Sequence, residues 1–172
     1  CEVNRSPGLR PHAEPPSIRA GIFDALLDRY FGNAGDGRIP IAVVTGTSGK
    51  TTTCRMVAAM LAASGAITGL ACTDGVSVGG RVLRRGDSSG ATAARMTLFD
   101  PTTEAAVLEV ARGGILRYGL PVDAADVVAV LNVGRDHLGQ DGAETVADIA
   151  RSKAVALQIA TRAVVLNADD PH

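Results

Sequence analysis

The residues with the clearest chemical meaning form a short glycine-containing loop. Residues 45–51 read TGTSGKT and lie between an apolar run, IPIAVVT, and a helical pattern. Glycines in such a loop allow backbone N–H groups to converge on phosphate oxygens, and the N-terminus of the next helix adds a partial positive charge. Lys50 would then contact the β- and γ-phosphates of ATP, and the Thr51 hydroxyl would bind Mg²⁺. We predict an ATP–Mg²⁺ site here; a glycine turn with an incidental lysine is the alternative.

The loop departs from the strict phosphate-loop pattern at Val44, where glycine is expected, and matches the shorter G-x-x-G-K-T form. By itself it does not separate a GTPase, a kinase and a ligase. A GTPase would carry an Asn/Thr-Lys-x-Asp motif, which the sequence lacks. A small-molecule kinase needs an arginine-rich lid, and the only arginine cluster comprises Arg81, Arg84 and Arg85. We interpret these three as solvated charges on a hairpin.

Glu109 is an acidic residue inside an otherwise apolar run, AAVLEVA at 105–111. A buried carboxylate costs several kcal/mol unless it is paired or bound to a metal ion. At a strand end beside a phosphate loop, Mg²⁺ is one such partner. An ordinary ion pair with Arg112 is the alternative.

Two further candidates follow the next apolar run. His137, in the sequence NVGRDHLG, could bind a metal ion or phosphate, and a loop histidine with no special role is the alternative. Lys153 lies on the same predicted helical face as Ile149, so we expect it to be partly buried. Burial favours the neutral amine, which can react with CO₂ to give an anionic carbamate. A lysine that extends its ammonium group into solvent is the alternative.

These residues need a scaffold that brings several strand ends together. From Ile39 onward, apolar runs alternate with helical stretches, which predicts an α/β fold with a P-loop-containing, doubly wound, mostly parallel sheet and its site at the strand C-termini. Strands are predicted over 39–45, 67–72, 105–111, 126–133 and 163–170, a hairpin over 76–85, and helices over 50–64, 92–99 and 144–160.

The amino-acid composition limits the classes of partner and the cellular compartment that we expect for this protein. The chain is 46% hydrophobic and 3% aromatic, which favours a helix-and-parallel-sheet protein over a barrel. Its net charge of −1 and scattered basic residues favour neither nucleic-acid nor membrane binding. Three cysteines without metal-site spacing indicate a reducing cytoplasm. One of them, Cys54, follows the loop closely; we expect a small buried residue there, and an activated thiol is the alternative.

The order of motifs along the chain resembles the central, ATP-binding domain of the Mur ligase superfamily. The motifs are, in order, VTGTSGKTTT, the strand with Glu109, the DH pair, the helix with Lys153 and the final LNADDP. The resemblance extends over residues 38–172. The run ARGGILR after the acidic strand is similar to the cyanophycin synthetases, and unlike the peptidoglycan and folate ligases. Ser48, where the family usually has asparagine, and Arg135, beside the Asp–His pair, depart from its pattern.

The resemblance implies an ATP-dependent carbon–nitrogen ligase. Such enzymes phosphorylate a carboxylate to an acyl phosphate, which an amine converts to an amide; in cyanophycin synthetases, arginine is joined to an aspartate side chain of a growing polymer. From their positions in the shared motifs, the expected catalytic residues are Lys50, His137 and Lys153. The resemblance allows Lys153 to be carbamylated. The expected metal ligands are Thr51, Glu109 and His137. The expected nucleotide-binding residues are Gly46, Thr47, Ser48, Gly49, Lys50, Thr51, Thr52, Asn132 and Asn167.

The resemblance also implies a domain order. Residues 1–20 carry four prolines, resemble the last metal-binding strand of an ATP-grasp domain, and are read as the end of such a domain or as a linker. Residues 21–37 are expected to form a short helix and a connection, and 38–172 the ligase-like domain. The lobe that binds the amine substrate is expected after His172, so we expect this chain to hold nucleotide without ligating alone, and a homo-oligomer is an option for the full protein. A stand-alone ATPase or small-molecule kinase, and a noncatalytic remnant, stay open as alternatives.

Overall fold

The computed structural model describes residues 24–25, 37–135, 138–139 and 142–172. The pattern of contacts within the chain divides the protein into two compact units, Cys1–Arg38 and Ile39–His172. Within the first unit, Asp24 and Ala25 are helical. The rest of the short helix expected within 21–37, and the whole of 1–20, lie outside the described residues. The second unit contains the fold described below.

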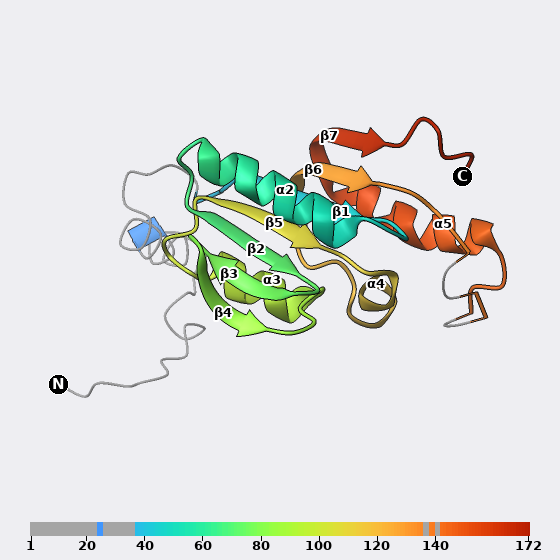
Figure 1. Cartoon of the computed structure of the whole chain (residues 1–172), viewed down its shortest axis with the longest axis horizontal. Helices are drawn as coiled ribbons and strands as arrows, with labels where there is room; N and C mark the ends of the chain where they lie inside the picture. Colours follow the sequence, from blue (N-terminus) through green and yellow to red (C-terminus); the bar gives the residue numbers. More distant parts are fainter. Residues whose placement is uncertain (1–23, 26–36, 136–137, 140–141) are drawn as a thin grey trace, which may run out of the picture. The chain divides into compact units, whose positions relative to one another are not determined.

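The second unit is built on a seven-stranded sheet in the order β4-β3-β2-β5-β1-β6-β7. Five neighbouring strands, from β2 to β7, are parallel, and β3 and β4 are antiparallel. Their arrowheads show the parallel strands ending at one edge (Figure 1). The predicted doubly wound, mostly parallel sheet is therefore confirmed. The strands are β1 (Ile41–Thr45), β2 (Thr68–Cys72), β3 (Gly75–Val78), β4 (Arg81–Arg85), β5 (Ala105–Glu109), β6 (Ala125–Val130) and β7 (Ala160–Leu166).

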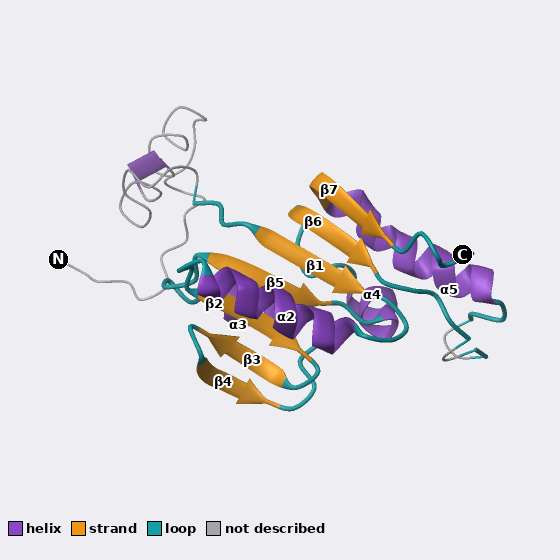
Figure 2. Cartoon of the chain, turned by 45° about the horizontal axis from the view of Figure 1, so that its top comes forward, coloured by secondary structure: helices purple, strands orange, loops and turns teal. Residues whose placement is uncertain are grey.

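Helices cover both faces of the sheet, which explains why the central strands are apolar without alternation. Helix α2 (Lys50–Ala63) lies on one face, where Cys54 packs with Val44 and Val107. The opposite face carries a larger cluster of buried apolar residues, among them Val43 and Leu108, and the remaining helices (Figure 2). These are α3 (Ala91–Leu98), α4 (Arg112–Tyr118), α5 (Val146–Ala154) and the 3₁₀ helix η2 (Val155–Ile159). No helix in the described part of the chain is long and apolar enough to cross a membrane.

Local details differ from the sequence-based expectations at several element boundaries and at one helix. The helix predicted over 144–160 is α5 followed by η2, and the last strand begins at Ala160 rather than at 163. Helix α4 was not predicted, because its sequence RGGILRY contains two glycines that lower helix propensity. Tertiary packing compensates, since Arg112 and Ile115 of α4 are buried. The hairpin around Gly79 and Gly80 is as predicted.

Cys54 is a core residue, as expected, and not an activated thiol. Its side chain is fully buried between α2 and the sheet. Burial, with a smaller contribution from the negative charge of Glu109, raises the pKa of the Cys54 thiol from 9.0 to about 12. The reactive thiolate is therefore disfavoured in the folded chain.

We expect iodoacetamide to leave Cys54 unmodified in the folded chain at about pH 8, and to modify it in concentrated urea, because only unfolding exposes the thiol. Peptide mass spectrometry would locate the adducts. Since folding raises this pKa, the contribution of Cys54 to stability is complete below pH 9.0 and falls as the pH rises toward about 12. Rapid modification of native Cys54 at about pH 8 would contradict this assignment.

Candidate nucleotide-binding site

The phosphate loop joins β1 to α2 and requires glycine at two positions. Gly46 has φ 154° and Gly49 has φ 82°. A Cβ atom on Gly46 would lie 3.0 Å from the Cβ of Leu131. Gly49 is also the N-cap of α2, where it adopts a left-handed conformation. Backbone geometry therefore favours glycine at both positions, and close packing adds to this requirement at Gly46.

Asn132, a predicted nucleotide-binding residue, holds the phosphate loop itself. Its Oδ1 accepts hydrogen bonds from the backbone N–H groups of Thr47, at 3.1 Å, and Ser48, at 2.9 Å. Its Nδ2 donates to the carbonyl oxygen of Ser48 at 3.1 Å, and its own carbonyl also accepts from Thr47 N–H at 3.0 Å. These four contacts fix the first half of the loop to the segment that follows β6.

The segment after β6 has two further anchors that the sequence reasoning missed. Gly134 N–H donates to the Thr47 hydroxyl at 2.8 Å, and a Cβ atom on Gly134 would lie 3.3 Å from that threonine's methyl carbon. The carboxylate of Asp170, beyond β7, accepts a 2.6 Å hydrogen bond from Val133 N–H. The glycine was part of the NVGRDHLG run and the aspartate part of LNADDP, but nothing in the sequence indicates their partners.

Lys50 and Thr51 open helix α2, where the backbone N–H groups of the first turn have no intrahelical partners. The Lys50 ammonium group donates to the carbonyl oxygen of Thr47 at 3.0 Å and so lies against the loop. Thr52, the next predicted contact, lies in the same first turn and is exposed. Backbone donors and a cation together favour an anion at this helix terminus.

Glu109 ends β5 beside the loop and is only 2% exposed. Its Oε2 accepts hydrogen bonds from the Thr51 hydroxyl and from Thr73 N–H, both at 2.9 Å. Its Oε1 accepts from the Thr73 hydroxyl, also at 2.9 Å. Sequence reasoning missed Thr73, although a polar residue directly after an apolar strand is the type of signal used for Glu109.

The donor atoms around Glu109 suit a hard divalent cation. A carboxylate and a hydroxyl oxygen lie next to each other, and Mg²⁺ prefers such oxygens. Among the described residues, no group of three or more His, Cys, Asp or Glu side chains could hold a metal ion. A cation here would therefore need further oxygens from water or from a nucleotide, as is usual for Mg²⁺.

The other predicted site residues lie around this core. Lys153 is 4% exposed on α5, which also buries Ile149, as expected; its carbamate stays a prediction. Asn167 follows β7, and its Oδ1 accepts a hydrogen bond from Asp169 N–H at 3.1 Å. His137 lies outside the described residues, so its predicted role stays a prediction.

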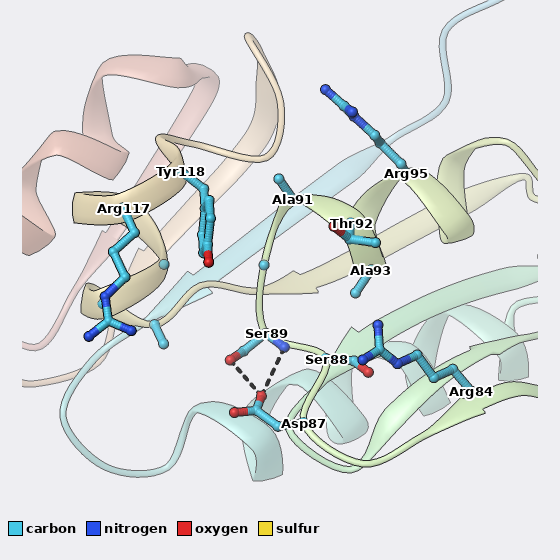
Figure 3. A pocket seen from close by; sticks show the side chains of 14 residues that line it. Arg84, Asp87, Ser88, Ser89, Ala91, Thr92, Ala93, Arg95, Arg117 and Tyr118 are labelled. Atoms are coloured by element: carbon cyan, nitrogen blue, oxygen red, sulfur yellow. Dashed lines mark hydrogen bonds between the residues drawn. The ribbon is translucent and has the colours of Figure 1, made fainter.

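A pocket of about 580 Å³ opens beside the residues that follow Glu109 in the chain. In Figure 3, the side chains of Arg117 and Tyr118 from α4 lie on one side and those of Arg84, from β4, and Arg95, from α3, on the other. Ser88 and Ser89 lie on the connection to α3; Asp87 accepts hydrogen bonds from the Ser89 N–H at 3.1 Å and hydroxyl at 2.9 Å. Arg84 is an exposed charge on the hairpin, as expected, and it also lines this pocket.

Comparison with known proteins identifies the relatives of this chain. Residues 44–172 match the Mur ligase middle domain. The chain is 44% identical to the cyanophycin synthetase of Crocosphaera subtropica over 173 residues, which is 99% of this chain and 20% of that protein. It thus spans about a fifth of that relative's length.

Two solved structures extend the comparison. One is a UDP-N-acetylmuramoyl-L-alanyl-D-glutamate–2,6-diaminopimelate ligase, with a TM-score of 0.65 and 26% identity over 84% of this chain and 30% of that one. The other is E. coli FolC in complex with DHPP and ADP, with a TM-score of 0.52 and 26% identity over 77% of this chain and 38% of that one. Because the matched family region covers well over half of the sequence, the chain belongs to the Mur ligase middle-domain family.

Proposed function

We propose that this chain binds ATP with Mg²⁺ and serves in an ATP-dependent ligase that makes an amide through an acyl phosphate. One observation carries the proposal: the Thr51 hydroxyl of the phosphate loop lies 2.9 Å from the buried carboxylate of Glu109. The pair joins the phosphate loop to a second strand end. The ADP complex of FolC and the ligase names of the other relatives support this reading.

The nucleotide phosphates would meet the second half of the loop. The N–H groups of Thr47 and Ser48 already donate to Asn132, so they hold the loop in shape. The first-turn N–H groups of α2 and the Lys50 ammonium are then the donors for phosphate oxygens. Lys50 can exchange its bond to the Thr47 carbonyl for a charge-assisted bond to phosphate.

Thr51 and Glu109 would hold Mg²⁺, whose bound form neutralises phosphate charge during phosphoryl transfer. Thr73 keeps the carboxylate in place through two hydrogen bonds, so Glu109 stays directed at the loop before any ligand binds. A preorganised carboxylate avoids the cost of ordering that side chain on binding. By the family resemblance, His137 and Lys153 would supply a second cation site, and Asn167 a contact on the adenine side.

We place the carboxylate substrate in the pocket bounded by Arg84, Arg95 and Arg117. In this pocket the guanidinium groups outnumber the one lining carboxylate, that of Asp87, so the pocket favours an anion. An aspartyl polymer would fit this charge. The carboxylate oxygen would attack the γ-phosphorus with release of ADP, and an amine, arginine by analogy with the cyanophycin synthetase relative, would displace phosphate to form the amide.

The two rival functions give different results in one assay. ADP release that requires both arginine and an aspartyl peptide supports the ligase; equal release without them supports a stand-alone ATPase or kinase. Failure to bind nucleotide at all would indicate a noncatalytic remnant. Nucleotide and peptide binding without turnover would support the proposed sites and assign the ligation step to the further segments that the longer relatives contain.

Replacing Lys50 with alanine should weaken ADP binding about a hundredfold, because a charge-assisted hydrogen bond to phosphate is lost. Isothermal titration calorimetry would measure the dissociation constant. Arg55→Ala removes one positive charge from the same helix, where Arg55 pairs with Asp74, and should leave ADP binding nearly unchanged. Equal affinities of wild type and Lys50→Ala would exclude the loop as the phosphate site.

Glu109→Gln should abolish most of the gain in ADP affinity that Mg²⁺ produces, a drop of about tenfold, while binding in EDTA changes little. The glutamine keeps one oxygen for Thr73 and loses the negative charge. Thr51→Val should behave similarly, and Thr51→Ser, which keeps the hydroxyl, should retain the Mg²⁺ effect. An unchanged Mg²⁺ effect in both Glu109→Gln and Thr51→Val would rule out this metal site.

Arg84→Ala and Arg95→Ala should each weaken binding of an aspartyl peptide about threefold, the scale of one exposed charge interaction. ADP affinity should not change. Fluorescence anisotropy of a labelled peptide would report binding. Arg85→Ala is the matched control, because Arg85 lies on the same hairpin outside the pocket lining. Equal losses in Arg84→Ala and Arg85→Ala would mean that the peptide senses only overall charge.

A further inference from the structure

Asp170 lies in the turn that follows β7, near the end of the LNADDP run, and is not among the predicted nucleotide or metal ligands. Its Oδ2 accepts the 2.6 Å bond from Val133 N–H, and its Oδ1 accepts a 2.9 Å bond from His172 N–H. These two backbone donors, Val133 N–H first, lower the pKa of the Asp170 carboxyl from its ordinary value. The contact between Asp170 and Val133 joins segments 37 residues apart in the sequence.

The bond to Val133 continues the sheet where its backbone ladder stops. Strands β6 and β7 pair as far as Val130 and Leu166. Three residues later, the Val133 N–H group meets a side-chain carboxylate instead of a strand carbonyl. A charged acceptor makes a stronger bond than a carbonyl, and it fixes the segment after β6 at the point where the two strands diverge.

The fixed segment is the one that shapes the phosphate loop. On one side of Val133, Asn132 binds the N–H groups of Thr47 and Ser48. On the other side, Gly134 donates to the Thr47 hydroxyl. The Asp170 carboxylate therefore binds Val133 directly, and the two residues on either side of Val133 hold the first half of the loop.

We propose that Asp170 is a positioning residue for the nucleotide phosphates: its carboxylate holds Val133, and through Asn132 and Gly134 it keeps the phosphate loop in its binding shape. The inference rests on the proposed nucleotide function. In this role Asp170 acts through Val133 rather than on a phosphate, so its removal should loosen the loop and leave the donor groups of the loop chemically intact. The loop then has to become ordered when nucleotide binds, and the lost conformational entropy weakens binding.

The test compares ADP affinity, measured by calorimetry with the 172-residue chain, across a small set of variants. Asp170→Ala should weaken ADP binding about tenfold, the scale of a charge-assisted hydrogen bond. Asp170→Asn keeps one acceptor oxygen and should lose less. Asp169→Ala is the matched control: it removes the same charge one residue away, from a carboxylate with no described side-chain contact, and should bind ADP like wild type. Equal losses at the two positions would reduce the effect to net charge and overturn the proposal.

A double-mutant cycle separates positioning from general destabilisation. If Asp170 acts through the segment that carries Asn132, Asp170→Ala should cause little further loss in an Asn132→Ala background. Full additivity of the two losses would overturn the proposal, as would wild-type ADP affinity in Asp170→Ala. Failure of the wild-type chain to bind ADP would instead refute the nucleotide function itself, so the two failures are distinguishable. Circular dichroism melts identify any variant that does not fold. If Asp170→Ala does not fold, the ADP affinity of Asp170→Asn is compared with that of wild type instead.

Discussion

The buried carboxylate of Glu109 is the constraint around which the site is arranged. An ionised group taken out of water costs several kcal/mol unless hydrogen bonds or a cation compensate it. Here the compensation comes from Thr51, at the beginning of α2, and from Thr73, directly after β2. One carboxylate at the end of β5 thereby joins the start of a helix to the segment after a neighbouring strand. A cation that replaced the Thr51 proton as partner would complete that compensation, which is why we read the group as a metal ligand.

The phosphate loop is shaped before any ligand arrives. Its first half donates to Asn132, its Thr47 hydroxyl accepts from Gly134, and close packing against Leu131 excludes a side chain at Gly46. Such preorganisation favours binding, because the ordering entropy is spent in folding rather than at the encounter with nucleotide. It also means that residues with no ligand contact influence affinity, so the boundary between fold and site is not sharp in this domain.

Much of this arrangement follows from local sequence. Continuous apolar runs predicted the buried strands, and the loop TGTSGKT and the acidic residue in AAVLEVA marked two groups that the structure brings together. Their roles toward phosphate and metal stay proposals. The misses share a physical cause. Thr73 and Asp170 owe their roles to partners 36 and 37 residues away, and no local pattern records such pairs. Helix α4 was missed because packing of Arg112 and Ile115 outweighs the low helix propensity of its glycines.

The central claim is that Thr51 and Glu109 together hold the cation that accompanies the nucleotide. A crystal structure of the chain grown with ADP and Mn²⁺ tests it most directly, because Mn²⁺ gives an anomalous signal and accepts the same oxygen ligands. We predict one strong anomalous peak bonded to the Thr51 hydroxyl oxygen and lying beside the Glu109 carboxylate, with the ADP phosphates at the start of α2. A peak at another group of residues, or phosphates bound away from Lys50, would contradict the account.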